Sequence, residues 1–267
     1  MDLSIITVTY NSKDMITEQI RSVILATEGV EYEQIVVDNA SVDGTPDLIE
    51  KEFPDVRIIR NSSNRGFGRP NNQGVEVASG EFILFLNPDN RFLKAGLPTE
   101  ASAKAGDLKR WLDWMRSHPD VGISACKLVN EKGEINLNAT PRRFPKLWEM
   151  LAIVYKLPHL LPNLLNGYLY SDRDFNLEQE VDSVRGSCML VRRELVEQLG
   201  FAFDPRYFIW FEDVDTCREA KRLGYKVVHT PIISCVDLVG QSFKKKNVWW
   251  KQKQFIKSMA KYFWKWS

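Results

Sequence analysis

The sequence is poor in cysteine and histidine, the side chains that form zinc sites and disulfide frameworks. It contains four cysteines and three histidines in 267 residues, and no two cysteines form a C-x-x-C pair. Zinc domains and disulfide-stapled folds need closely spaced cysteine or histidine ligands, so the sequence disfavours both classes. Scattered single cysteines are typical of buried thiols in a reducing compartment.

Long apolar runs are missing as well. No uncharged apolar stretch reaches the roughly 18 residues that a membrane-spanning helix needs. The longest candidate, residues 157–171, is shorter and contains Pro158 and Pro162. Residues 1–11 lack the basic start and apolar core of a secretory signal. We therefore expect a cytoplasmic protein.

The chain carries almost no net charge. The 36 basic residues balance 35 acidic ones and leave a formal charge of +1, which disfavours a general nucleic-acid-binding role. Apolar residues make up 44% of the chain and charged residues 27%, as in soluble globular proteins, so disorder and fibrous repeats are excluded. The length suits one large α/β domain with an appendage, or two domains.

The first ninety residues alternate between strand and helix periodicity. Ile16, Ile20, Val23 and Ile24 follow the spacing of one helix face, and a second helix is expected after residues 43–46. Such alternation predicts a Rossmann-like, mostly parallel sheet flanked by helices. The strands predicted in this half cover residues 3–9, 34–38, 56–60 and 82–86.

The second half is less regular. Residues 147–170 are apolar but interrupted by prolines, and we interpret them as a lid or an acceptor-side segment. Strands are predicted over residues 121–125 and 183–191, and helices over 108–115, 194–199 and from 212 to about 224.

Polar residues gather where three predicted strands end. Tyr10 and Asn11 follow the first strand, Asp38 closes the second, and residues 87–90 (Asn-Pro-Asp-Asn) follow the fourth. Because ligands of parallel sheets bind beyond the carboxyl ends of the strands, we expect a site at this edge. Asp89 could hold Mg²⁺ or Mn²⁺ against a diphosphate, since these cations prefer oxygen ligands. An Asx turn is the alternative role for Asp89.

A second acidic group follows an aromatic stretch. Glu212, Asp213 and Asp215 come directly after residues 208–211, and a carboxylate beside aromatic walls is a suitable general base. Acids that stabilise a helix N-terminus are the alternative. Arginines in or near loops could bind a diphosphate through their forked guanidinium groups, although surface arginines are common. These arginines are Arg65, Arg69, Arg142, Arg143 and Arg185, of which we assign Arg65, Arg142 and Arg143 to the donor.

Seven segments occur together in an order that is typical of one family. The chain resembles the family 2 glycosyltransferases of the GT-A fold, especially the bacterial rhamnosyltransferase-like branch, from residue 4 to about residue 243. The matching segments are SIITVTYNS, IVVDNASVDGT, NRGFGRPNNQG, GEFILFLNPD, VRGSCMLVRRELVEQLG, FDPRYFIWFEDVDTC and VGQSF.

The resemblance implies roles for individual residues. Asp89, with Asn87 at the D-x-D position, would bind the metal, and Asp213 would be the catalytic base with Glu212 beside it. Gly186 would pack against the donor sugar. The remaining donor-binding positions that the resemblance implies are Thr9, Tyr10, Asp38, Arg65 and Asn72.

Two positions depart from the pattern. Asn87 replaces the first aspartate of a strict D-x-D motif, although asparagine is usual in this branch. Asp237 stands where relatives commonly carry a histidine. An ionised Asp237 could ligate a hard cation but could not donate a hydrogen bond to phosphate.

The implied reaction is an inverting sugar transfer. One carboxylate accepts the proton of the acceptor hydroxyl, and a divalent cation with arginines stabilises the departing nucleoside diphosphate. The resemblance predicts transfer of L-rhamnose from dTDP-rhamnose, or else of a hexose from a UDP-sugar, to a glycan or polyprenyl-linked glycan in bacterial cell-surface polysaccharide synthesis. A catalytically silent nucleotide- or glycan-binding module is the alternative, because of Asp237. A nucleotidyltransferase is disfavoured, since residues 8–15 lack its glycine- and arginine-rich signature.

The C-terminal segment is strongly basic and aromatic. Residues 244–267 contain eight lysines, no acid and seven aromatic residues. This pattern predicts an amphipathic helix on an anionic membrane surface, which would place the protein peripherally on the inner face of the cell membrane. Packing of the aromatic residues on the catalytic domain is the alternative, and nucleic-acid binding is disfavoured. We therefore divide the chain into a GT-A domain (1–243, with a nucleotide-binding half 1–90 and an acceptor and catalytic half 91–243) and a tail (244–267).

Overall fold

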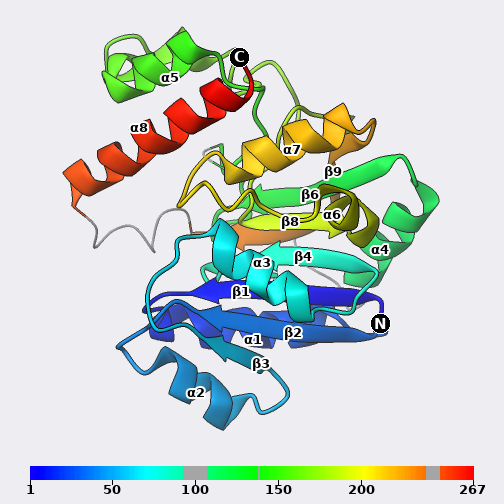
Figure 1. Ribbon diagram of the computed structural model, residues 1–267. Helices are drawn as coiled ribbons and strands as arrows, with labels where there is room; N and C mark the ends of the chain where they lie inside the picture. Colours follow the sequence, from blue (N-terminus) through cyan, green and yellow to red (C-terminus); the bar gives the residue numbers. More distant parts are fainter. Residues whose placement is uncertain (93–106, 138, 239–246) are drawn as a thin grey trace.

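A single mixed β-sheet with helices on both faces forms the centre of the protein (Figure 1). The computed structural model describes residues 1–92, 107–137, 139–238 and 247–267. Within these residues the sheet has nine strands in the order β3-β2-β1-β4-β8-β6-β9-β5, with β7 beside β9. The strands are β1 (Leu3–Thr9), β2 (Tyr32–Asp38), β3 (Arg57–Arg60), β4 (Phe82–Leu86), β5 (Asn90–Phe92), β6 (Val121–Val129), β7 (Gln179–Glu180), β8 (Cys188–Arg192) and β9 (Lys226–Asp237).

Helices cover both faces of the sheet. Successive side chains of a strand point to opposite faces, and both faces carry apolar side chains that must be buried. Leu3 and Ile5 pack toward α1 and α4, whereas Ile6 packs toward the face that α3, α6 and α7 cover. The helices are α1 (Lys13–Ala26), α2 (Thr45–Glu52), α3 (Gly68–Val77), α4 (Asp107–Ser117), α5 (Leu147–Val154), η1 (Leu157–His159), η2 (Pro162–Leu165), α6 (Arg193–Leu199), α7 (Glu212–Arg222) and α8 (Val248–Lys265).

The predicted parallel sheet is confirmed in the first half of the chain. Strands β1, β2, β3 and β4 pair in parallel, and Thr9 lies opposite Asp38 at their carboxyl ends. In the second half β6 and β9 are parallel, whereas β8, β5 and β7 run antiparallel to their neighbours. The polar ends of β1, β2 and β4 therefore meet at one edge of the sheet, as predicted.

The strand predicted over residues 183–191 is wrong in its first half. Strand β8 begins only at Cys188. Before it, Ser183 exchanges backbone hydrogen bonds with Arg142, and the Gly186 N–H donates to the carboxylate of Asp213. Because these bonds replace pairing with β4, residues 183–187 form a loop that carries Arg185 and Gly186 to the site.

The helix expected in the tail is confirmed, and one side of it packs on the protein. In Figure 1, α8 lies beside α5 at the end of the molecule away from β3. Phe255, Met259 and Tyr262 join a core with residues of α5 and the loop before α7. Residues 244–246 of the predicted tail and the VGQSF segment (239–243) lie outside the described residues. No helix in the described part of the chain is long and apolar enough to cross a membrane.

Candidate active site

The carboxyl ends of β1 and β2 bring Thr9 and Asp38 together. The Thr9 hydroxyl donates to Asp38 Oδ1 at 2.8 Å, and the Ser41 N–H donates to Asp38 Oδ2 at the same distance. Both Thr9 and Asp38 are buried. These contacts hold the Asp38 carboxylate rigidly at the sheet edge, next to the first of two cavities.

The first cavity has a volume of about 110 Å³, and four aromatic side chains line it: Tyr10, Phe67, Phe208 and Trp250. Gly66 approaches the wall so closely that a Cβ atom would lie 2.0 Å from the Phe208 carbonyl oxygen, and its φ of +88° also favours glycine. Trp250 of α8 meets Phe208 edge-on, with ring centroids 6.0 Å apart. Flat apolar walls beside Tyr10 and Asn39 suit a planar nucleobase.

The second cavity, of about 290 Å³, contains most of the predicted catalytic residues. Asn87 and Phe67 line both cavities, so the two lie side by side. Met150 and Ile153 of α5 and Phe255 of α8 form an apolar wall of the second cavity. The predicted residues that line it are Asn87, Arg142, Gly186, Glu212 and Asp213.

Asp213 lies on the first turn of α7 with its carboxylate held by two backbone donors. Gly186 N–H donates to Oδ2 at 3.1 Å, and Val214 N–H donates to Oδ1 at 2.8 Å. Trp210 and Phe211, just before α7, have φ values of +65° and +70°. Such left-handed backbone in bulky residues is strained and is kept only where packing enforces it. The half-buried carboxylate is thus fixed at the cavity wall.

Glu212 is more deeply buried than its neighbour Asp213. Its side chain is buried, and Oε2 has no hydrogen-bond partner among the described residues. Burial and the adjacent negative charge of Asp213 raise the pKa of Glu212 to about 8. Glu212 therefore retains its proton at neutral pH and is a poor general base, which leaves Asp213 as the better candidate.

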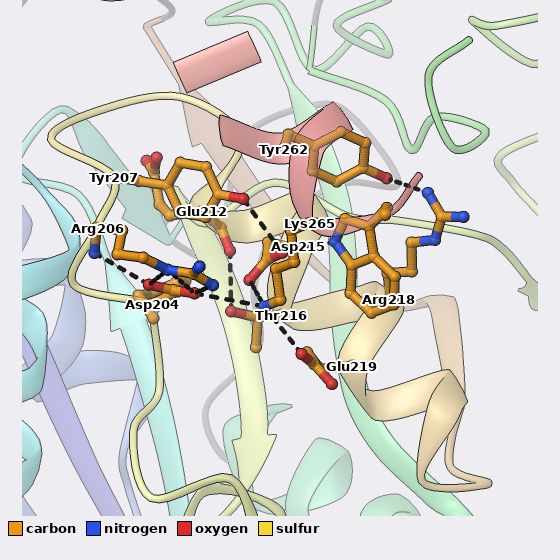
Figure 2. Close-up of polar contacts among 12 residues, drawn as sticks. Asp204, Arg206, Tyr207, Glu212, Asp215, Thr216, Arg218, Glu219, Tyr262 and Lys265 are labelled. Atoms are coloured by element: carbon orange, nitrogen blue, oxygen red, sulfur yellow. Dashed lines mark hydrogen bonds and ion pairs between the residues drawn. The ribbon is translucent and has the colours of Figure 1, made fainter. Parts of the chain in front are cut away.

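An ion-pair network links the end of α8 to the first turns of α7 (Figure 2). Lys265 Nζ lies 2.7 Å from Asp215, 2.8 Å from Glu219 and 3.4 Å from Asp204. The Trp266 indole N–H also donates to Asp215, at 2.7 Å. The end of α8 is therefore tied to the helix that carries Asp213.

Asp89 and Asp237 form the acidic end of the site. Asn90 pairs with Asp237 across strands β5 and β9, which places Asp89 next to Asp237. Burial and the negative charge of Asp237 raise the pKa of Asp89 to about 6. Asp89 Oδ1 is buried and has no hydrogen-bond partner among the described residues, whereas the Ser187 hydroxyl donates to Asp237 at 3.0 Å.

This donor set fits a hard divalent cation. Two neighbouring carboxylates, one with an unbonded buried oxygen, are stabilised by a cation between them. The described residues contain no group of three or more histidine, cysteine or acidic side chains that could hold a metal. Phosphate oxygens or water would therefore have to complete the coordination of Mg²⁺ or Mn²⁺.

Arg185 is a site residue that the sequence analysis named only as one of five candidate diphosphate-binding arginines and did not assign to the donor. Its largely buried guanidinium lines the second cavity and interacts with Asp213, Asp237 and Asp89. Burial and the neighbouring Arg142 lower the pKa of Arg185. Its place directly before Gly186 in the motif VRGSC was the available signal.

Five predicted donor-binding residues line neither cavity. Two of them, Thr9 and Asp38, lie at the sheet edge described above. Asn72 Nδ2 donates to the Phe203 carbonyl at 2.7 Å, and its Oδ1 accepts from the Phe203 N–H at 3.0 Å. The Arg143 guanidinium donates to the Gly167 carbonyl and lies over the ring of Tyr170, 4.3 Å from its centroid. Arg65 is exposed in a separate hollow. Asn72 and Arg143 thus hold loops together, and a donor contact by any of the five stays a prediction.

The geometry and the family comparison agree on one class of protein. The fold and the two-cavity site define a GT-A glycosyltransferase. A family model described as Glycosyl transferase family 2 matches residues 4–200, and one described as Glycosyltransferase like family 2 matches residues 172–254. The chain belongs to glycosyl transferase family 2.

Individual relatives differ in the sugar they transfer. The chain is 28% identical over 240 residues to the N-acetylglucosaminyl-diphospho-decaprenol L-rhamnosyltransferase of Mycobacterium tuberculosis, covering 86% of this chain and 73% of the relative. It is 25% identical over 239 residues to a low-salt glycan biosynthesis hexosyltransferase of Haloferax volcanii, covering 88% of this chain and 66% of that protein.

Solved structures support the fold. The mannosyltransferase PcManGT of Pyrobaculum calidifontis, in complex with GDP-Man and Mn²⁺, superimposes with a TM-score of 0.62 at 21% identity, over 98% of this chain and 64% of that one. TarS 1-349 of S. aureus, in complex with UDP-GlcNAc, gives a TM-score of 0.58 at 19% identity, over 93% of this chain and 62% of that one. The chain thus spans just under two thirds of these structures.

Proposed function

We propose that this chain is an inverting, metal-dependent glycosyltransferase whose general base is Asp213. The observation that carries the proposal is the placement of Asp213, which Gly186 and Val214 hold at the wall of the second cavity. The acidic pair Asp89 and Asp237 is linked to the same cavity through Arg185. A base and a diphosphate-binding end in one site are what a single-displacement transfer requires.

In this reaction an acceptor hydroxyl attacks the anomeric carbon of the donor. Asp213 takes the hydroxyl proton as the new C–O bond forms and the bond to the nucleoside diphosphate breaks. Arg185 and Arg142 stabilise the charge that builds on the departing phosphate oxygens. Mg²⁺ or Mn²⁺ between Asp89 and Asp237 would supply further stabilisation of that charge when bound.

The donor and acceptor are proposed from the relatives. The L-rhamnosyltransferase of M. tuberculosis supports L-rhamnose as the sugar, and the hexosyltransferase of H. volcanii supports a hexose as the second candidate. We expect dTDP-rhamnose as the donor in the first case and a UDP-sugar in the second. The name of the first relative also supports a polyprenyl-diphosphate-linked glycan as acceptor, within synthesis of a cell-surface polysaccharide.

A lipid-linked acceptor requires contact with a membrane, and α8 is suited to it. Trp249 and Trp264 are 80% and 77% exposed, and Lys253 lies on the same stripe of the helix. Interfacial tryptophans with lysines favour the surface of an anionic bilayer. We place the protein peripherally on the inner face of the cell membrane through this helix.

The test is release of nucleoside diphosphate from a panel of sugar nucleotides with Mg²⁺, Mn²⁺ or EDTA. Metal-dependent hydrolysis of one donor is the expected result and would name the sugar. Binding without release, even with a lipid-linked acceptor, would overturn the proposal in favour of a silent binding module. In that case Asp237→His would be the variant to make.

A further inference from the structure

Exposed apolar side chains are concentrated in two segments of the protein. Of the eighteen large apolar side chains that are exposed among the described residues, eleven lie within residues 147–161 or within α8. Scattered single apolar residues on a surface are ordinary, but a concentration of this kind marks an interaction site. The eleven are Leu147, Trp148, Leu151, Tyr155, Leu157, Leu160, Leu161, Val248, Trp249, Ile256 and Trp264.

The two segments are neighbours in the structure. Helices α5 and α8 lie side by side in Figure 1, and Gln252 Nε2 donates to the Val154 carbonyl at 3.2 Å. Buried residues of both helices, Met150 and Met259 among them, share one core. The exposed side chains of the two segments therefore belong to one region of the surface.

The outward stripe of α8 has the form of an interfacial helix. Trp249, Lys253, Ile256, Ala260 and Trp264 are all exposed and follow each other at spacings of three or four residues. At a rise of 1.5 Å per residue, the two tryptophans stand about 22 Å apart along the helix. The opposite side of α8 is the one that packs on the protein.

The charge of this region is of one sign. Between residues 144 and 171 the only acid is Glu149, which is buried, while Lys146 and Lys156 are exposed. Helix α8 contains no acid and exposes Lys253 and Lys257. Apolar side chains among lysines without exposed carboxylates complement the surface of an anionic bilayer better than that of an ordinary protein.

We propose that residues 147–161 form, together with α8, one surface that binds anionic membranes. The segment 147–161 is the new element, because the proposed function assigns membrane contact to α8 alone. The same two elements line the second cavity through Met150, Ile153 and Phe255. The role of this surface in catalysis rests on the proposed function. The arrangement would bring a polyprenyl-linked acceptor from the bilayer along an apolar wall toward Asp213.

The test measures flotation of the full chain with phosphatidylcholine vesicles, with and without phosphatidylglycerol. Tyr155 and Leu160 are 73% and 78% exposed, so Tyr155→Ser/Leu160→Ser changes the surface without opening the core. The matched control is Ile24→Ser/Leu25→Ser on α1, where the two side chains are 51% and 55% exposed. Thermal midpoints of both variants verify folding.

The wild type and the α1 control are expected to bind anionic vesicles equally and neutral vesicles weakly. Tyr155→Ser/Leu160→Ser is expected to partition at least about tenfold less, because two apolar side chains no longer enter the interface. Wild-type binding by this variant, or no binding of the wild type to anionic vesicles, would overturn the proposal. The proposal would also be overturned if the variant lost self-association in sedimentation while its vesicle binding stayed unchanged. A second copy of the chain would then cover the surface.

Hydrolysis of the donor without lipid separates this proposal from the proposed function. The variant is expected to keep wild-type hydrolysis, because neither Tyr155 nor Leu160 lines the cavities. Vesicle binding by a wild-type chain that hydrolyses no donor would refute the proposed function and leave the membrane surface standing.

Discussion

Lys265 Nζ, at the end of α8, lies 2.7 Å from Oδ2 of Asp215, two positions beyond the proposed base. Asp215 is fully buried and Lys265 is only 14% exposed, so the pair is shielded from solvent. The carboxylates of Glu219 and Asp204 face the same ammonium group. Lys265 thus faces three acids at the first turns of α7. Asp204 and Glu219 also pair with Arg206 and Arg222, whereas Lys265 is the ion-pair partner of Asp215 among the described residues.

Lys265→Met should destabilise the protein by about 3 kcal/mol, because it leaves the buried carboxylate of Asp215 without its cation. Urea unfolding followed by circular dichroism measures the change. Lys257→Met is the matched control, since Lys257 is exposed on the same helix, and it should alter stability little. Equal stability of the two variants would show that the network contributes nothing.

Asp213→Asn should lower the rate of sugar transfer by about 10²- to 10⁴-fold, the contribution of a general base. Donor affinity should stay within about twofold, because the amide oxygen still accepts a hydrogen bond. Steady-state kinetics and calorimetric donor binding measure the two effects. Asp55→Asn, in an exposed loop, is the control. Wild-type turnover of Asp213→Asn would refute the assignment of the base.

Asp89→Asn should weaken Mn²⁺ binding in the presence of nucleoside diphosphate by about tenfold or more, since a neutral amide replaces a charged ligand. Titration calorimetry measures the affinity, and EDTA gives the metal-free baseline. An Mn²⁺ affinity equal to that of the wild type would remove Asp89 from the metal site.

Glu212 should make stability depend on pH. Its pKa is raised from 4.5 in the unfolded chain to about 8 in the fold, so the folded state binds the extra proton between these values. The free energy of unfolding should therefore fall as the pH rises through this window. Glu212→Gln, which cannot ionise, should lose that part of the slope in urea unfolding at pH 5 and pH 8. Parallel profiles of the variant and the wild type would contradict the raised pKa.

Arg142 and Arg143 are adjacent but should respond differently to alanine. Arg142 lines the second cavity, so Arg142→Ala should weaken donor binding by about tenfold, the loss of one charge-assisted hydrogen bond. Arg143 contacts Gly167, Tyr170 and Asp172 instead, so Arg143→Ala should mainly cost about 1–2 kcal/mol of stability. Donor titrations and thermal unfolding of both variants separate the effects, and a reversed pattern would exchange the two roles.

The regular strands and the polar sheet edge were predictable from the sequence. Residues 82–86 are buried on both faces, so they form a short continuous apolar run that the sequence shows directly. Parallel pairing of β1 and β2 then brings Thr9 to Asp38. Helix α3 was missed because its segment contains Gly68, Pro70 and Gly74, which usually interrupt helices. Gly74 is required there, since a Cβ atom would lie 2.6 Å from the side chain of Ile6.

Side-chain roles that depend on distant partners were not predictable. Nothing local distinguishes Arg142 from Arg143, because the contact of Arg143 with Gly167 arises from a loop more than twenty residues away. Residues 183–187 were predicted to extend the apolar strand that follows them, yet β8 begins only at Cys188, and Gly186 bonds to Asp213 instead. In both places, hydrogen bonds to residues far away in the sequence determine the structure, and the local sequence pattern does not reveal them.

Helix α8 supplies a wall to each cavity, through Trp250 on the nucleotide side and Phe255 on the side of Asp213. A displacement of this helix changes both volumes together. Ligand binding in one cavity therefore changes the free energy of ligand binding in the other, and the effect is the same in both directions. In the proposed reaction, a donor that immobilises α8 would prepare the acceptor side in advance, so we expect the donor to bind first.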